Sequence, residues 1–264
     1  MMVDNSTPAL EQTRSRSTHA TLVVRHSRAV AITVMSSSML DSLEQQGIPR
    51  EGVHVQPMGV DLQNRFVPDP SMTRSESEIL FVGRLVEKKG LRYLLEALPA
   101  IVQAHPAAHL TIAGYGPEQP NLEAQADALG ISDCVNFLGA VPQNHLPALY
   151  RRAAVFVAPF VEARGGDQEG LGLVTVEAIG CGCPVIVSDL PAVGDVIAEP
   201  RMKTPPADSV ALAARTSETL QMAAEDRQRL AKRTRQGLLE QFSWATRARE
   251  YAELLKHITT DGGD

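Results

Sequence analysis

Short apolar runs alternate with helix-like segments along residues 79 to 187, and this alternation limits the folds open to the chain. Leu91, Leu94 and Leu98 recur at the spacing of one helix face, which predicts an amphipathic helix between the first two runs. Strands that alternate with helices predict a parallel sheet covered on both faces. We therefore expect an α/β fold with a Rossmann-like parallel sheet, whose ligand lies outside the carboxyl ends of the strands. The runs predicted as strands are Ile79–Val82, Leu110–Ala113, Val135–Leu138, Val155–Ala158 and Pro184–Val187.

A loop that opens into an apolar helix occupies residues 169–177, and the helix is expected to begin near Gly172. Its residues are apolar nearly all round, which is typical of a buried helix. The first turn carries glycines and no bulky polar side chain, so its backbone N–H groups and the positive end of the helix dipole are open to an anion. The sequence therefore predicts an anion site at the start of this helix.

Two glutamates lie at the ends of this segment, Glu169 in the loop and Glu177 in the helix. Glu177 is expected among hydrocarbon side chains, where an unpaired carboxylate is costly. With a phosphate on the helix amides, the two carboxylates would accept hydrogen bonds from hydroxyls on either side of it, and a nucleotide-sugar has this layout. The alternative is that both glutamates are solvated or form structural ion pairs, which are common in proteins.

The loop after the first predicted strand runs from Gly83 to Gly90 and carries Arg84 and Lys89. Arginine binds a diphosphate as a planar fork and lysine binds it as a point charge, so both residues are candidates for this role. A solvated surface loop is the alternative. Gly116 and Val141 lie in the turns after the second and third strands, where an ordinary turn explains each of them equally well.

The 264 residues have a formal net charge of −6, which argues against a nucleic acid partner. No apolar run has the length of about 18 residues that a membrane span needs, and the N-terminus lacks a signal-peptide pattern. We expect a cytoplasmic protein, and the alternative is that it associates peripherally with the inner face of the membrane. The three cysteines do not form a disulfide pattern, and we interpret Cys181 and Cys183 as buried thiols.

Several motifs resemble one family. The pattern Glu-x7-Glu at 169–177, followed by Ala-x-Gly-x-Gly-x-Pro-Val-Ile at 178–186, resembles the signature of the retaining, GT-B-fold glycosyltransferases of family 4, the large group 1 family. The loop 83–90 matches the Gly-Arg-x4-Lys-Gly pattern of that family. Residues 57–61 resemble its interdomain Pro-Asn-Gly-Val-Asp, with Met58 in place of Asn, and residues 242–244 resemble its Phe-Ser-Trp C-terminal helix.

This resemblance implies roles for individual residues. Arg84 and Lys89 would stabilise the departing nucleoside diphosphate, and Glu169 would hold hydroxyls of the transferred sugar. Glu177 would hold the ribose. No Asp-x-Asp motif is present, and the resemblance implies a donor site that needs no metal or other cofactor. The remaining residues expected to bind the donor are Gly83, Gly116, Val141, Gly170, Leu171, Gly172, Leu173 and Val174.

Changes in composition divide the chain into five segments. Residues 1–18 are polar and expected to be poorly ordered. Residues 19–65 resemble the last part of the N-terminal domain of the GT-B fold, with a helix expected at 20–29, and residues 66–78 are interpreted as a linker. Residues 79–240 are the nucleotide-sugar-binding Rossmann-like domain, and residues 241–264 are a C-terminal crossover helix and tail. That helix is expected either to pack on residues 20–60 or to expose an apolar patch.

The activity implied is transfer of a hexose from a nucleotide-diphosphate sugar to a glycan or lipid-linked acceptor. Because most of the family's N-terminal domain has no counterpart in residues 1–65, two alternatives follow. The chain is a catalytically silent module that binds a nucleotide-sugar, or it is half of a split enzyme completed by a separate N-terminal domain partner.

Overall fold

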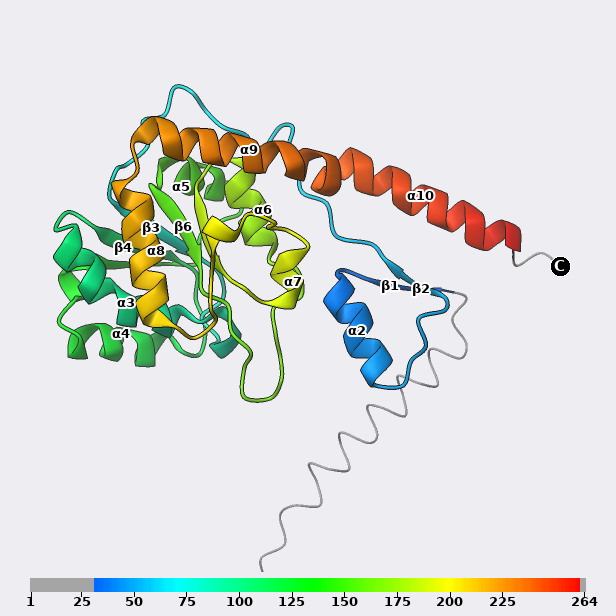
Figure 1. Cartoon of the computed structure of the whole chain (residues 1–264), viewed down its shortest axis with the longest axis horizontal. Coiled ribbons are helices and arrows are strands. Elements are labelled where there is room, and N and C mark those ends of the chain that lie inside the picture. The colour runs from blue at the N-terminus through cyan, green and yellow to red at the C-terminus, as the bar shows by residue number, and fades with distance from the viewer. Residues whose placement is uncertain (1–30, 262–264) are drawn as a thin grey trace, which may run out of the picture.

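The main sheet is parallel throughout and has the strand order β5-β4-β3-β6-β7-β8. The computed structural model describes residues 31–261, and within them these six strands form one sheet (Figure 1). The predicted α/β fold with a Rossmann-like parallel sheet is confirmed. The strands are β3 (Glu78–Val82), β4 (His109–Ala113), β5 (Val135–Gly139), β6 (Val155–Ala158), β7 (Val185–Ser188) and β8 (Lys203–Thr204).

Helices cover both faces of the sheet because alternate strand residues point to opposite sides. Leu80 and Val82 pack with α5, α6 and α9, whereas Ile79 and Phe81 pack with α3, α4 and α8. Each face thus has its own apolar core. The helices are α3 (Leu91–Ala104), α4 (Gln119–Ala128), α5 (Leu146–Arg152), α6 (Leu173–Gly180), α8 (Ser209–Gln221) and α9 (Ala224–Phe242).

The direction of chain progression across the sheet reverses between β3 and β6. The chain first places β4 and β5 on one side of β3, and it then returns to place β6, β7 and β8 on the other side. Ligands of open α/β sheets bind at such a reversal, outside the carboxyl ends of the strands. The loops that follow β3 and β6 meet there, since the Val161 amide donates a hydrogen bond to the carbonyl oxygen of Lys88.

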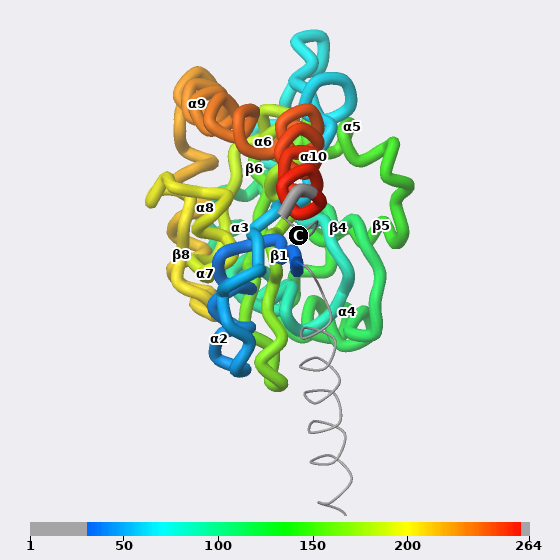
Figure 2. The backbone as a smooth tube through the Cα atoms, turned by 90° about the vertical axis from the view of Figure 1, so that its right-hand side faces the viewer, coloured from blue at the N-terminus to red at the C-terminus, as the bar shows by residue number. Residues whose placement is uncertain are grey.

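A small β-α-β unit precedes the main domain, with strands β1 (Ile32–Val34) and β2 (Val53–Val55) paired in parallel. Ser36 caps the intervening helix α2 (Ser37–Gln45), because its hydroxyl accepts a hydrogen bond from the Met39 amide. The unit lies beside α7 (Pro191–Gly194), where the Ser37 amide donates to Asp195 Oδ2 at 2.8 Å (Figures 1 and 2). The helix expected at residues 20–29 lies outside the described residues.

The C-terminal helix α10 (Trp244–Asp261) follows α9 and projects away from the main domain (Figure 1). Its start is attached to the chain near residue 60, because the indole Nε1 of Trp244 donates to the Gly59 carbonyl oxygen at 3.0 Å. Tyr251 and Leu255, farther along the helix, are 46% and 49% exposed. Within the described residues, each of the two expectations therefore holds for one part of the helix: its start contacts residues 59–60, and its later turns expose apolar side chains. Within residues 31–261, no helix is both long enough and apolar enough to cross a bilayer.

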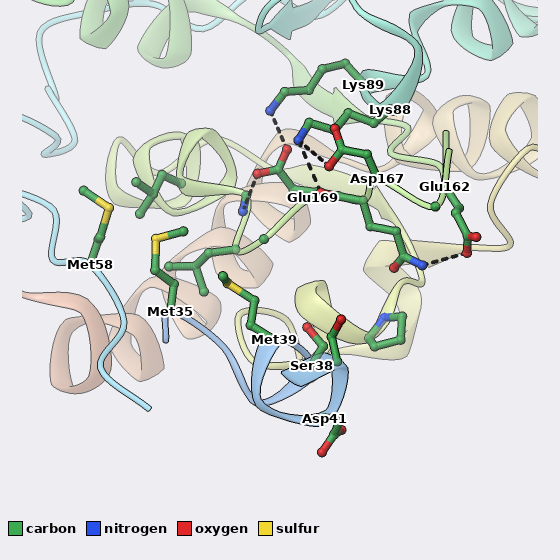
Figure 3. A pocket seen from close by; sticks show the side chains of 18 of the residues that line it. Met35, Ser38, Met39, Asp41, Met58, Lys88, Lys89, Glu162, Asp167 and Glu169 are labelled. Carbon is green, nitrogen blue, oxygen red and sulfur yellow. Dashed lines mark hydrogen bonds and ion pairs between the residues drawn. The ribbon is translucent and has the colours of Figure 1, made fainter. Parts of the chain in front are cut away.

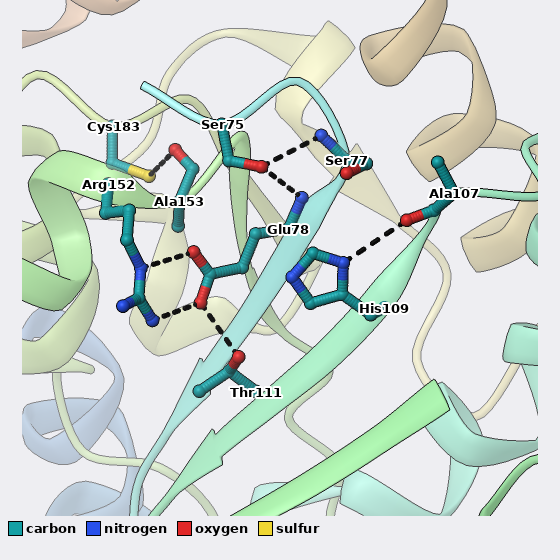
Figure 4. Close-up of polar contacts among 9 residues, drawn as sticks. All are labelled: Ser75, Ser77, Glu78, Ala107, His109, Thr111, Arg152, Ala153 and Cys183. Atoms are coloured by element: carbon teal, nitrogen blue, oxygen red, sulfur yellow. Dashed lines mark hydrogen bonds and ion pairs between the residues drawn. The ribbon is translucent and has the colours of Figure 1, made fainter. Parts of the chain in front are cut away.

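A polar cluster around the buried carboxylate of Glu78 joins two strands and a helix at the amino edge of the sheet, opposite the carboxyl ends (Figure 4). Glu78 accepts two hydrogen bonds from Arg152, at 2.7 and 2.6 Å, and a third from the Thr111 hydroxyl at 2.8 Å. Burial raises the pKa of Glu78, but these hydrogen bonds outweigh burial and hold the pKa below its ordinary value. The carboxylate of Glu78 is therefore satisfied by groups of the protein itself.

Candidate functional site

A cavity of about 950 Å³ lies at the carboxyl edge of the sheet, between the main domain and the small β-α-β unit. Its volume is within the range of ligand pockets in proteins. The walls come from the loops after β3 and β6, from the first turn of α6 and from α2 (Figure 3). The lining includes Lys89, Glu169, Gly170, Leu171, Gly172, Leu173 and Val174, which the sequence also singles out.

Lys89 and Glu169 form an ion pair in this cavity, with Lys89 Nζ 2.6 Å from Glu169 Oε2 (Figure 3). Each side chain is 14% exposed, so the pair is largely shielded from water. The Gly172 amide donates a second hydrogen bond to the carboxylate, at 3.2 Å from Oε1. The ammonium group also lies 5.0 Å from the centre of the Phe160 ring, close enough for a cation–π contact. The loops after β3 and β6 therefore place a cation, a carboxylate and a helix amide at one point.

The carboxylate of Glu169 is charged in this arrangement. Burial raises its pKa, but the charge and hydrogen bond of Lys89, together with the Gly172 amide, outweigh burial and lower the pKa below its ordinary value. Glu169 is thus a permanent anion at neutral pH, held beside the start of a helix.

The start of α6 depends on Gly172, whose φ of +70° lies in the left-handed region. A Cβ atom there would also lie 3.1 Å from the Phe160 ring. The predicted start of the helix near Gly172 is confirmed, since its first residue is Leu173. The amides of Leu173 and Val174 lie in the first turn, where helix geometry provides no intrahelical acceptor. These two residues line the cavity, so a bound anion would find free N–H donors there.

Further ion pairs hold the two loops together, and sequence reasoning missed them. Lys88 Nζ lies 3.0 Å from Asp167 Oδ1 (Figure 3), and Arg164 Nε lies 3.6 Å from Glu87 Oε1. The loop after β3 has the charge order Glu87, Lys88, Lys89, and its partners in the loop after β6 carry the complementary charges. Complementary charge order was a signal in the sequence, but it could be used only once the two loops were known to be neighbours.

Glu177 does not line this cavity; its carboxylate lies deeper, toward α5. Its Oε2 accepts a hydrogen bond from the Tyr150 hydroxyl at 3.0 Å, and Gln143 is a second hydrogen-bond partner. Burial raises the pKa of Glu177, and the hydrogen bonds and the charge of Arg65 offset only part of that rise. Val141 belongs to the same loop as Gln143 and packs against the core, so the structure brings the loop after β5 to Glu177.

The other residues selected from the sequence have different surroundings. Arg84 is exposed, and it takes part in no ion pair within the described residues. A Cβ on Gly83 would lie 3.6 Å from the Lys89 side chain, and a Cβ on Gly116 would collide with the Leu85 carbonyl oxygen. Glycine at position 116 thus lets two loops pack closely, and its expected contact with the donor stays a prediction.

Two further sequence interpretations concern metals and thiols. In residues 31–261, no cluster of three or more His, Cys, Asp or Glu side chains could hold a metal ion. Cys181 and Cys183 are buried free thiols, as predicted, and burial raises their pKa values to about 12 and about 11. Such thiols are protonated and unreactive at neutral pH.

Comparison with known proteins identifies relatives of this chain. The model of the family "Glycosyl transferases group 1" matches residues 69–237. The chain is 31% identical to WcaL of Escherichia coli K12, named as a candidate colanic acid biosynthesis glycosyltransferase, over 82% of this chain and 54% of that protein. It is 32% identical to the GDP-mannose-dependent alpha-(1-6)-phosphatidylinositol monomannoside mannosyltransferase of Mycolicibacterium smegmatis, over 75% of this chain and 55% of that protein.

Solved structures show the same fold. The structure of Anabaena Alr3699/HepE in complex with UDP and glucose superposes with a TM-score of 0.76 at 23% identity, and it covers 86% of this chain and 63% of that chain. The chain spans about half the length of the curated relatives it matches.

Proposed function

The chain belongs to the glycosyl transferases group 1 family, and from this premise we propose that it binds a nucleotide-diphosphate sugar in the cavity at the start of α6. The diphosphate contacts the amides of Leu173 and Val174 and the ammonium group of Lys89. The observation that carries the proposal is the meeting of Lys89, Glu169 and the Gly172 amide in a cavity of about 950 Å³.

The proposed reaction is a hexosyl transfer that retains the anomeric configuration, as in family 4. Positive charge on Lys89 and the helix amides stabilises the negative charge that grows on the leaving diphosphate. Arg84 would also stabilise the negative charge on the leaving diphosphate. It lies in the same loop after β3 as Lys89, and its side chain is exposed. Glu169 holds hydroxyls of the transferred sugar. No metal or other cofactor is required, because the cationic groups come from the protein.

The nucleoside end of the donor is proposed to lie toward Val141 and Glu177. Two contacts support this placement: the loop after β5 reaches Glu177, and the Glu177 carboxylate is already held by Tyr150. Gly83 lies beside the Lys89 side chain, and Gly170 lies beside Met35 and Met39 of the small β-α-β unit, so both are also proposed to border the donor. We assign the ribose to Glu177 and the nucleobase to the loop at Val141.

The acceptor is proposed to be a glycan or a lipid-linked sugar that approaches from the side of α2. Met35 and Met39 of this side line the cavity across from the start of α6 (Figure 3). A lipid-linked acceptor would favour a cytoplasmic protein that associates peripherally with the inner face of the membrane. The name of the mycobacterial relative, which refers to a phosphatidylinositol monomannoside, supports this class of acceptor.

Binding of UDP and GDP by titration calorimetry tests the donor site. Lys89→Met should weaken binding by about tenfold, because it removes a charge-assisted hydrogen bond to phosphate. Glu177→Ala should also weaken binding. Lys232→Met, which removes an exposed lysine on α9, is the matched control and should leave the Kd unchanged. Failure of both nucleotides to bind, or unchanged binding in Lys89→Met and Glu177→Ala, would overturn the proposal.

A second candidate function follows from the length of the matched relatives. Because the chain spans about half of them, we also consider a module that binds the nucleotide-sugar but needs a separate N-terminal domain partner for transfer. The purified chain would then bind UDP or GDP and transfer no sugar to glycan or lipid-linked acceptors. Sugar transfer by the purified chain alone would contradict this second candidate.

A further inference from the structure

Glu169 occupies the donors that a phosphate would use. Its Oε2 lies 2.6 Å from Lys89 Nζ, and its Oε1 accepts the Gly172 amide at 3.2 Å. A lysine ammonium and an amide at a helix start are the two kinds of donor that bind phosphate oxygens in proteins. The carboxylate oxygens therefore stand where the oxygens of a bound anion would otherwise be.

The carboxylate and a phosphate cannot both use these donors at full strength. The Gly172 amide has a single hydrogen, so it cannot donate fully to two acceptors. The charge of Lys89 is already neutralised by Glu169, in a pair whose two side chains are each only 14% exposed. In such a shielded position the attraction between charges is less screened by water than at the surface.

We propose that Glu169 is an internal competitor of the donor diphosphate, and that it alternates between the Lys89–Gly172 donors and the sugar. The inference rests on the proposed donor site and adds a regulatory function to it. With a nucleotide-sugar bound, the diphosphate takes over Lys89 and the amide, and the released carboxylate turns to the sugar hydroxyls. After transfer no sugar holds Glu169, so the carboxylate returns to Lys89 and displaces the nucleoside diphosphate. The residue thereby promotes product release.

The test compares anion binding by the full chain and its variants, with pyrophosphate, UDP and GDP as probes in titration calorimetry. Glu169→Gln keeps the shape of the side chain but removes its charge, so each anion that binds should do so with a Kd about three- to tenfold lower than in the wild type. Combination with Lys89→Met should remove most of the gain, because only the Gly172 amide then remains as a donor for which Glu169 competes.

Asp167→Asn is the matched control. It removes one carboxylate charge from the same cavity, but Asp167 pairs with Lys88 rather than Lys89. Direct competition predicts a clearly larger gain in Glu169→Gln than in Asp167→Asn. Equal gains in the two variants would show a general effect of charge and would overturn the inference. Thermal unfolding of each variant shows that the compared proteins are folded.

The outcomes separate this inference from the proposed function. If UDP or GDP binds to the wild type but Glu169→Gln binds it no more tightly, the inference fails and the donor site stands. If pyrophosphate binds more tightly to Glu169→Gln while neither nucleotide binds, the competition stands and the proposed function fails. If no probe binds to any variant, both are overturned.

Discussion

Lys89 and Glu169 lie 80 positions apart in the chain, yet their side chains form the shortest contact of the site described above. The pair forms because Gly90 and Gly172 let the two loops turn at the carboxyl edge of the sheet. Gly90 has a φ of +67°, and a Cβ there would collide with the Pro159 carbonyl oxygen. At the scale of single residues, glycines therefore determine where the side chains of Lys89 and Glu169 lie. The charges of these two side chains are the groups that a ligand would contact.

Substitution of Gly172 by alanine tests this dependence. The variant should lose about 1 to 2 kcal/mol of unfolding free energy, because an L-residue is strained at positive φ and its Cβ would crowd the Phe160 ring. Gly237→Ala is the control, since Gly237 lies inside α9 with open space around it. That variant should gain about 0.5 to 1 kcal/mol from the higher helix propensity of alanine. Urea denaturation measures both, and a Gly172→Ala protein as stable as the wild type would contradict the assignment.

At the scale of elements, the parallel strands carry different chemistry at their two ends. At the amino edge, the Glu78 carboxylate is held by three hydrogen bonds from Arg152 and Thr111. At the carboxyl edge, by contrast, the first-turn amides of α6 line a cavity, and the helix meets cations from the neighbouring loop. At one edge of the sheet a carboxylate is thus held by hydrogen bonds within the protein, and the other edge borders a cavity. The two edges differ in this way because all strands run in the same direction, so their amino ends and their carboxyl ends lie at opposite edges.

The Glu78 cluster predicts a dependence of stability on pH. A carboxyl group whose pKa is lowered by folding stabilises the protein above its unfolded pKa of about 4, and the contribution disappears as pH falls through the folded-state value. Glu78→Gln should therefore be less stable than the wild type by about 1 to 3 kcal/mol at pH 7, with part of the Arg152 contribution screened by water.

The difference between Glu78→Gln and the wild type should narrow below about pH 4. Urea denaturation from acid to neutral pH measures it, with Glu240→Gln on the exposed surface of α9 as the control. A difference that stays constant across this pH range would show that the charge of Glu78 does not contribute.

At the scale of the whole molecule, α10 is a weakly covered helix of the described chain. It projects from the main domain (Figures 1 and 2), and its exposed apolar side chains include Trp244, Tyr251 and Leu255. Trp244 contacts the chain at Gly59 through its indole nitrogen. Tyr251 and Leu255, beyond this contact, are exposed to solvent, and exposed apolar patches promote association between proteins.

Self-association should therefore depend on this helix. The double substitution Tyr251→Ser and Leu255→Ser should lower the weight-average sedimentation coefficient at high protein concentration, relative to the wild type, because it removes apolar surface from contact. Sedimentation velocity over a range of concentrations measures the effect. Substitution of the exposed Val210 by serine, on α8, is the control and should have little influence. Equal concentration dependence in the wild type and the double variant would exclude α10 as the contact surface.

Much of the fold was predictable because its signals are local. Apolar periodicity identified β3 to β7 and α3, and glycines with an apolar run identified the start of α6. The short β8 was harder to predict, since its two residues carry little periodicity. The site was predictable only in part: Lys89 and the first turn of α6 line the cavity, whereas Lys88 and Asp167 were missed and Arg84 is exposed.

The sequence by itself determined the alternation of strands and helices and the buried character of α6, and it supplied the residues that are predicted to bind an anion. Each of these features depends on residues that are close together in the sequence. The tertiary structure alone decided that Glu169 pairs with Lys89, that Glu177 turns toward Tyr150 and that Arg84 faces solvent. Those choices depend on which loops the strand order brings together and on how side chains pack between them, and residues 80 positions apart leave no local pattern of such a contact.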